Sequence, residues 1–208
     1  MNVEQTNESD HSELVILDAG PVLNFMGRKD TTDLYLKTLK NMTDSILIPD
    51  AVVDEVEHKS DKDDRFKTCH KKLLTVIGGK HIVALSTPPR NKDDEYEFHW
   101  TWVMNNCPQE MLSSSKNRGE MVLVAHARVF RAQGRDVVAM IDDQDAAALA
   151  RRAGIPTFNT VQLFQESVVW GVIPDKAELK RLYGLVQEKD DGLLPFKLTP
   201  LKEEFSNT

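Results

Sequence analysis

Two short apolar runs in the sequence each end in acidic residues. The runs are 14–17 and 137–141, and the aspartates that follow them are Asp18, Asp142, Asp143 and Asp145. Short continuous apolar runs are typical of buried parallel strands, and ligand sites in open α/β sheets gather beyond the carboxyl ends of such strands. Two strands that deliver carboxylates to one edge predict a site for a divalent cation, because Mg²⁺ prefers oxygen ligands.

Each of these aspartates also has a purely structural interpretation. Asp18 would cap the turn or the helix that follows the first strand, and one of the three later aspartates would cap a helix at 144–153. Three carboxylates within four residues are more than a cap needs. A calcium-binding loop is excluded, because no glycine stands at the sixth position from Asp142 and no glutamate at the twelfth. We therefore expect the cluster to meet acidic residues from elsewhere in the fold.

A predicted helix at 50–58 supplies further acidic candidates. If its valines face the core, Glu55 and Glu57 flank that face and Asp54 points away. Periodicity alone does not choose between the two glutamates.

Glu120 stands in the first turn of a predicted helix at 118–133. Asn117 and Glu120 have the spacing of a capping box, in which both would serve only to begin the helix. Gly119 weakens a helix at this position, however. Its presence fits a place where another group approaches the backbone closely.

Strands and helices alternate along the rest of the chain. Strands are expected at about 14–18, 45–48, 81–85, 137–141 and 155–158. Helices are expected near 30–42, 50–58, 94–112, 118–133, 144–153, 160–170 and 175–187. This alternation predicts an α/β protein with a central, mainly parallel sheet and helices on both faces.

The organisation into domains follows from the same pattern. One domain is expected over 14–190, between a disordered N-terminus at 1–13 and a C-terminal tail at 191–208. The mostly helical segment 59–117 is interpreted as an elaboration inserted between the two halves of this domain.

Composition limits the classes of function. The 208 residues include 26 Lys and Arg against 33 Asp and Glu, a net charge of −7, which argues against a protein that coats nucleic acid through positive charge alone. A nuclease is not excluded, because a carboxylate site is neutralised by its own cations. No apolar run approaches the roughly 20 residues that cross a bilayer, and the two cysteines are expected to be reduced thiols. We expect a cytoplasmic protein without a membrane partner.

Aromatic and basic residues are further candidates for binding groups. Trp100 and Trp102 are interpreted as core residues of the inserted helix, with base stacking as the alternative. Three arginines are expected to hold phosphate groups if they lie at the rim of the acidic site. These are Arg118, Arg151 and Arg152.

Four motifs in this order resemble those of PIN domain ribonucleases, in particular VapC-like toxins and bacterial PIN-like proteins with a Gly-Glu motif. The matching pieces are Leu17-Asp18-Ala19-Gly20-Pro21, the stretch from Pro49 to Val56, Gly119-Glu120-Met121, and Ile141-Asp142-Asp143-Gln144-Asp145. The resemblance covers about 14–58 and 118–170. Two features depart from it: segment 59–117 is longer than in compact toxins, and Ala147 stands where related sequences often have arginine.

The resemblance implies a PIN-like three-layer α/β/α sandwich that binds Mg²⁺ or Mn²⁺. It implies four catalytic acids, which are Asp18, Glu55, Glu120 and Asp143. It implies a metal-binding set made of Asp18, Glu120, Asp142, Asp143 and Asp145. It also favours Glu55 over Glu57, a choice that periodicity left open.

The function expected on this basis is metal-dependent endoribonuclease activity, with RNA as substrate, in the toxin of a toxin–antitoxin pair. An antitoxin protein or a second copy of the chain is a possible partner of the helix at 175–187 and the tail. Two alternatives remain open: a catalytically silent PIN-like module that binds RNA or protein, and a nuclease directed to DNA or flap structures. A metal-activated water does not need the 2′-hydroxyl, so the chemistry does not exclude DNA.

Overall fold

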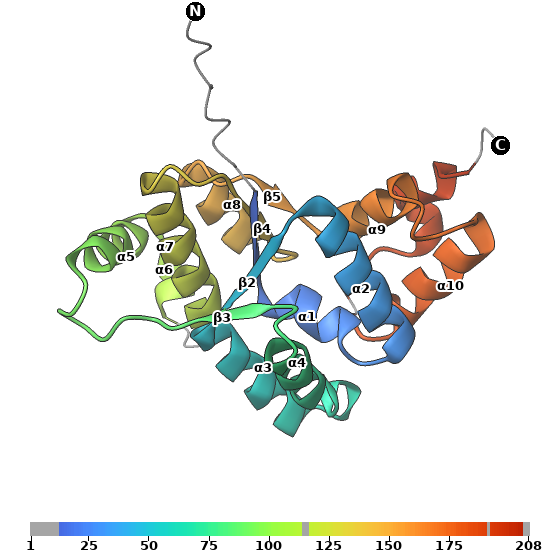
Figure 1. Cartoon of the computed structure of the whole chain (residues 1–208), viewed down its shortest axis with the longest axis horizontal. Coiled ribbons are helices and arrows are strands. Elements are labelled where there is room, and N and C mark those ends of the chain that lie inside the picture. The colour runs from blue at the N-terminus through green and yellow to red at the C-terminus, as the bar shows by residue number, and fades with distance from the viewer. Residues whose placement is uncertain (1–12, 114–116, 191, 206–208) are drawn as a thin grey trace, which may run out of the picture.

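A five-stranded, all-parallel sheet forms the centre of the molecule (Figure 1). The computed structural model describes residues 13–113, 117–190 and 192–205. The strands run in the order β3-β2-β1-β4-β5. Their bounds are β1 Leu14–Leu17, β2 Ser45–Pro49, β3 Val83–Leu85, β4 Val137–Met140 and β5 Thr157–Phe158. The predicted α/β class with a parallel sheet is confirmed.

The central strand β1 is buried along its whole length, as its continuous apolar run predicts. It pairs with β2 on one side and β4 on the other, with Leu14 opposite both Ser45 and Val137. The carboxyl ends of these strands therefore lie side by side. Asp18, Asp50 and Asp142 all follow directly or within two residues of a strand end at this edge.

Two layers of helices cover the two faces of the sheet, which confirms the three-layer sandwich. Alternate side chains of β1 enter different cores: Val15 and Leu17 one, Leu14 and Ile16 the other. The first core is closed by α1 Ala19–Phe25, α2 Lys29–Met42, α3 Asp50–Lys62, α4 Cys69–Gly78, α9 Thr160–Val169 and α10 Lys176–Gln187. The second is closed by α5 Asp94–Asn106, α6 Gln109–Leu112, α7 Arg118–Ala132 and α8 Gln144–Arg152.

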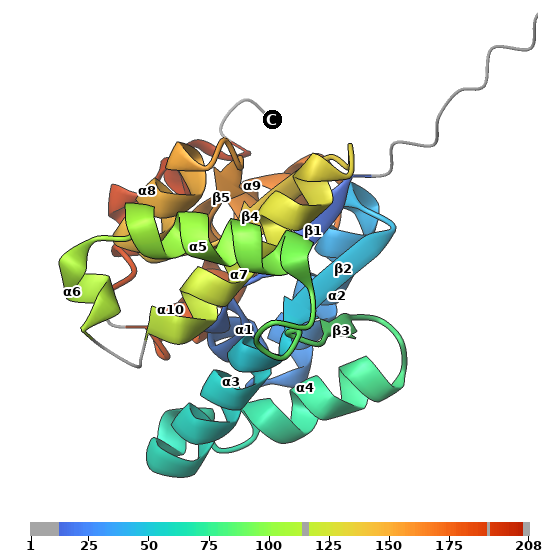
Figure 2. The same ribbon diagram turned by 90° about the vertical axis from the view of Figure 1, so that its left-hand side faces the viewer.

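Segment 59–117 contributes to the sheet and to both helical layers. It holds the 3₁₀ helix η1 Asp64–Phe66 and helix α4 on one face, the edge strand β3, and helices α5 and α6 on the other face. Figure 2 shows α5 lying along α7. The single helix expected over 94–112 is two helices, since Pro108, which lacks an N–H group, follows the break at Cys107.

The C-terminal segment packs back on the domain. Helix α10 buries four apolar side chains in the first core, and Leu201 in the 3₁₀ helix η4 Pro200–Glu203 is fully buried there. The Tyr183 hydroxyl donates a hydrogen bond to the Leu194 carbonyl oxygen at 2.6 Å, near the 3₁₀ helix η3 Phe196–Leu198. Residues 1–12, most of the N-terminus expected to be disordered, lie outside the described residues. Within the described ranges, no helix combines the length and apolar character that a membrane crossing needs.

Candidate functional site

Asp18 is a buried carboxylate at the end of the central strand. It occupies the position before α1, where its side chain makes no N-cap hydrogen bond, although the Ala19 amide at the start of the helix helps to stabilise its charge. It is 3% exposed, and its Oδ1 atom has no hydrogen-bond partner among the described residues. Burial, and next the charge of Glu55, raise the pKa of Asp18 to about 7.

The structure separates the two glutamates of α3. Glu55 is half-buried and lies close enough to Asp18 to raise its pKa. Its Oε1 atom is 2.8 Å from Nζ of Lys59, one helical turn later. Glu57 is exposed, and its Oε1 atom lies 3.8 Å from Nδ1 of His70 on α4. Glu55 therefore faces the strand-end aspartate, and Glu57 faces away from it.

Gly119 lets α7 approach α3 closely, as its position in the helix indicates. A Cβ atom at this position would lie 2.8 Å from Oε2 of Glu55 and 3.3 Å from Cγ2 of Val52. The group that approaches the Gly119 backbone is thus the side chain of Glu55, another candidate site residue. The alternative capping box is not formed, because Asn117 makes no side-chain cap and its amide instead donates to the Met111 carbonyl oxygen.

Glu120 is half-buried beside these carboxylates. Burial is the largest effect on its pKa, followed by the charges of Asp18, Asp143 and Glu55, and together they raise the pKa to about 8. Four acidic residues from four different segments therefore interact electrostatically: the β1 end, α3, α7 and the loop before α8. These are the four acids that the resemblance designates as catalytic.

The three aspartates after β4 have different positions. Asp143 is exposed and caps α8, its Oδ1 atom accepting hydrogen bonds from the amides of Asp145 at 2.8 Å and Ala146 at 2.9 Å. Asp142 accepts hydrogen bonds from the amide and the hydroxyl of Thr160, both at 2.7 Å, which fixes the start of α9. Asp145 is exposed in the first turn of α8. Of the three, Asp143 is the one whose charge affects Glu120.

A polar bridge connects this edge to the C-terminal segment. The amide of the buried residue Asn24 donates to Oδ2 of Asp190 at 2.8 Å and to Oδ2 of Asp142 at 3.3 Å. Burial and the charge of Asp190 contribute to a raised pKa of Asp142. Sequence reasoning missed Asn24 and Asp190, since they lie 166 residues apart and neither belongs to a recognisable motif.

The candidate site residues offer the oxygen ligands that hard divalent cations such as Mg²⁺ prefer. All four interacting groups are carboxylates, and the unpartnered, buried Oδ1 atom of Asp18 is a ligand atom that the protein itself does not satisfy. Among the described residues, no three His, Cys, Asp or Glu side chains form a ready-made metal-binding group. The chemical type of these residues therefore fits a divalent cation. In the described residues, however, their side chains do not converge closely enough to form a complete set of ligands.

A cleft of about 940 Å³ opens beside Glu55 and Gly119. Its basic lining residues come from several segments and are Lys59, Lys62, Arg65, Arg118 and Lys189. Of the three arginines expected at the rim, Arg118 lines this cleft. Arg151 lines a separate hollow with Asp142 and Asp143, and Arg152 is exposed at the end of α8.

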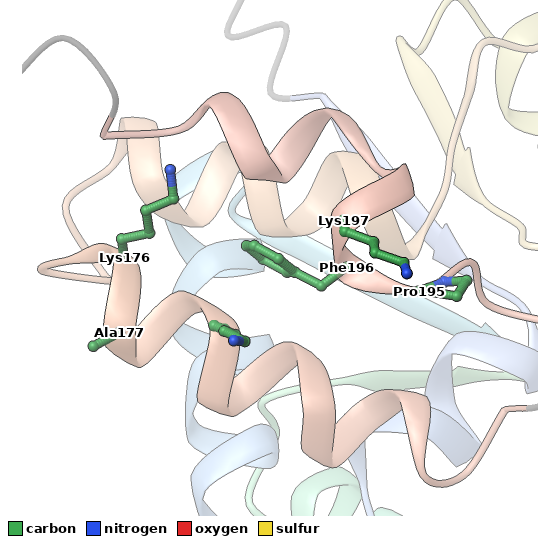
Figure 3. Close-up of a pocket in the computed structure, with 6 residues that line it drawn as sticks. Lys176, Ala177, Pro195, Phe196 and Lys197 are labelled. Carbon is green, nitrogen blue, oxygen red and sulfur yellow. The ribbon is translucent and has the colours of Figure 1, made fainter.

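A further hollow of about 580 Å³ lies between α10 and η3 (Figure 3). Three lysines and Phe196 line it, and none of the candidate acidic residues does. The lysines are Lys176, Lys180 and Lys197. This hollow is separate from the carboxylate site.

No protein-family model and no curated protein matches the chain. The resemblance to PIN domains therefore rests on the four motifs and stays a prediction. The fold and the positions of the acidic residues are the observations from which function is inferred below.

Proposed function

We propose that the protein is a metal-dependent endoribonuclease that hydrolyses phosphodiester bonds of RNA at the Asp18 site. The observation that carries this proposal is the buried Asp18 carboxylate, which has an unpartnered oxygen and shares its surroundings with Glu55 and Glu120. A carboxylate in such a place is costly unless a positive charge joins it. Carboxylates at the carboxyl edge of a parallel sheet are suited to hold that charge.

The roles of the residues follow from their surroundings. Asp18 and Glu120, with Asp143 at the exposed side, would hold Mg²⁺ or Mn²⁺. Glu55, which is ion-paired with Lys59, would orient a water molecule. The chemistry that a bound cation supplies is activation of water and neutralisation of charge on the phosphoryl oxygens.

Asp142 has a different role in this proposal. Its oxygens already accept hydrogen bonds from Thr160 and Asn24. We assign it to positioning α9 and the Asp190 segment around the site.

The test is cleavage of a structured RNA by the purified full-length protein, with Mn²⁺ or Mg²⁺ and with EDTA. We expect cleavage that EDTA and Asp18→Asn both abolish. Glu55→Gln should lower the rate strongly, whereas Glu57→Gln, the matched change on the outer side of α3, should leave it unchanged. A chain that leaves RNA intact under all metal conditions would refute the proposal, and a DNA strand of the same sequence tests substrate class.

A catalytically silent RNA-binding module is the second candidate. It is favoured by one observation, the lack of a ready-made metal-binding group among the described residues. RNA binding without metal-dependent cleavage would support this candidate.

The toxin role and an antitoxin partner are part of the proposal that rests on the resemblance alone. Expression of the wild-type chain should arrest growth of a bacterial host, and Asp18→Asn should relieve the arrest. Equal growth with both chains would argue against a toxin.

A further inference from the structure

A small hollow of about 190 Å³ lies at the same edge of the sheet as the carboxylates. Thr87 and Pro88, which follow β3, form one side of it, and Val122 of α7 and residues of α5 form the others. This volume is below the roughly 300 Å³ of a pocket for a drug-sized ligand. The hollow therefore has room for a single flat ring system, but not for a base pair.

Arg118 joins this hollow to the carboxylate site. Its side chain lines both the small hollow and the large cleft beside Glu55. Arg118 and Val122 are four residues apart and share one face of α7, next to the face that carries Gly119. A ligand in the hollow would thus be adjacent to a phosphodiester at the carboxylates.

Tyr96 and Thr87 close the inner wall of the hollow. Tyr96 is 4% exposed, and its ring packs on His126 at 5.0 Å between centroids. The Thr87 side chain lies within hydrogen-bonding reach of the buried Tyr96 hydroxyl, and the Thr87 hydroxyl donates its own proton to Asp50. This wall is therefore held by contacts within the protein, and a ligand in the hollow would make its polar contacts with the other walls.

An indole ring forms part of the wall. Trp100 is half-buried, and no aromatic ring or cation is found stacked on it within the described residues. Trp102, two positions later, differs: the Arg128 guanidinium lies 3.9 Å from its ring centroid. Of these two tryptophans, Trp100 is the one that lines the hollow, as base stacking requires.

The charged groups around the hollow match guanine. Arg90 and Arg118 offer N–H donors, which pair well with the O6 and N7 acceptors of guanine. Glu97 accepts a hydrogen bond from the backbone amide of Asn91 at 3.0 Å. It keeps further acceptor sites for the N1–H and N2–H groups of guanine. No other standard base combines these acceptors and donors.

We infer that this hollow binds one guanine base of a single-stranded RNA, stacked on Trp100 and hydrogen-bonded to Arg90, Arg118 and Glu97, next to the phosphodiester to be cleaved. The inference rests on the proposed function for its choice of RNA. It adds a base preference and the residues that set it.

The test measures binding separately from cleavage. Full-length protein in EDTA is titrated with short single-stranded RNAs that are all adenine or carry one guanine, and tryptophan fluorescence is followed. We expect about tenfold tighter binding of the guanine strand, with quenching that Trp100→Phe removes and Trp102→Phe retains. Glu97→Gln, which removes the charged acceptor for the N1–H and N2–H groups, should lower the guanine preference about fivefold.

Equal binding of the two strands, or the same guanine preference in Glu97→Gln as in the wild type, would overturn the inference. Cleavage of RNA without base preference would overturn it as well and leave the proposed function intact. Guanine-selective binding without any metal-dependent cleavage would support the hollow as a base site and refute the nuclease proposal.

Discussion

Asp18 has electrostatically unfavourable surroundings at the end of the central strand. Its carboxylate is buried, one oxygen lacks a partner, and Glu55 and Asp142 both add negative charge nearby. The Ala19 amide and Lys59 offset part of this cost. Either a proton or a cation can relieve the rest, and the two compete for the same oxygens.

We predict that Mg²⁺ or Mn²⁺ raises the melting temperature of the protein. At a free concentration of 100 times Kd, the gain is about 2.7 kcal/mol, which corresponds to a shift of roughly 5–10 °C in a protein of this size. Asp18→Asn should remove the shift, which differential scanning calorimetry measures. Glu57→Gln serves as the control and should retain it. An identical shift in Asp18→Asn would contradict the role of this residue.

Stability of the metal-free protein should depend on pH through the same residues. The pKa of Asp18 rises from 3.8 to about 7 and that of Glu120 from 4.5 to about 8, so the folded state binds these protons more tightly than the unfolded state. The resulting stabilisation is complete below the unfolded values and is lost as pH rises through about 7 and 8.

Denaturant titrations in EDTA at pH 6 and pH 9 test this sign. We expect the free energy of unfolding to fall by up to about 4 kcal/mol at the higher pH, because pH 6 lies about one unit below the pKa of Asp18 and about two units below that of Glu120, and each unit corresponds to about 1.4 kcal/mol. The double variant Asp18→Asn, Glu120→Gln should show a much smaller change. A wild-type protein that is more stable at pH 9 than at pH 6 would disprove the assignment.

At the scale of elements, the contact between α3 and α7 sets the position of Glu55. Gly119→Ala would place a methyl group 2.8 Å from Oε2 of Glu55, whose flexible end can move, and 3.3 Å from Val52, which can move less. Alanine gains about 1 kcal/mol of helix propensity, which offsets part of this clash. We therefore predict a small change in melting temperature but at least a tenfold loss of cleavage.

Gly184→Ala is the matched control for that variant. Gly184 also lies within a helix, α10, and a Cβ atom there would meet no atom within 4 Å. It should raise stability by up to about 1 kcal/mol and leave cleavage unchanged. If Gly119→Ala cleaves RNA as fast as Gly184→Ala, the close approach of α7 to Glu55 has no functional importance.

Sequence patterns predicted the elements well because each pattern is local. The continuous run at 14–17 and the amphipathic spacing of α7 depend on neighbouring residues alone, and both elements form where expected. The predicted strand at 155–158 begins two residues later than expected, at Thr157, directly after Pro156, which has no N–H group for the sheet. Contacts between side chains from distant segments are not encoded in such local patterns, so the sequence did not predict them.

The orientation of individual site residues depends on such distant contacts. Glu55 and Glu57 are equivalent by periodicity, and only the packing of α3 against α7 and α4 distinguishes them. The spacing of Asn117 and Glu120 suggested a capping box, but Asn117 bonds to Met111 instead. Asp142 and Asp143 are neighbours in sequence, yet one fixes α9 and the other caps α8.

At the scale of the whole molecule, charge is distributed unevenly despite the net value of −7. Acidic side chains gather at the end of the central strand. The adjoining cleft is lined by lysines and arginines from α3, η1, α7 and the residues after α10, together with Asp54, Glu55, Asp63 and Asp190. The cations of the cleft are the groups that could contact an RNA backbone. The same arrangement predicts binding that weakens strongly with salt.

Lys62 provides the sharpest test of this arrangement, because it is exposed and lines the cleft without belonging to the acidic site. If Lys62 contacts one phosphate group, Lys62→Ala should reduce the slope of log affinity against log salt concentration by about 0.7 for a single strand. Lys180→Ala removes the same charge from the hollow beside η3 and should leave the slope unchanged. The measurement is fluorescence anisotropy of a labelled RNA with the Asp18→Asn protein in EDTA, at several salt concentrations. Equal slopes for the two lysine variants would mean that the strand does not pass through the cleft, because loss of a single phosphate contact must appear in one variant alone.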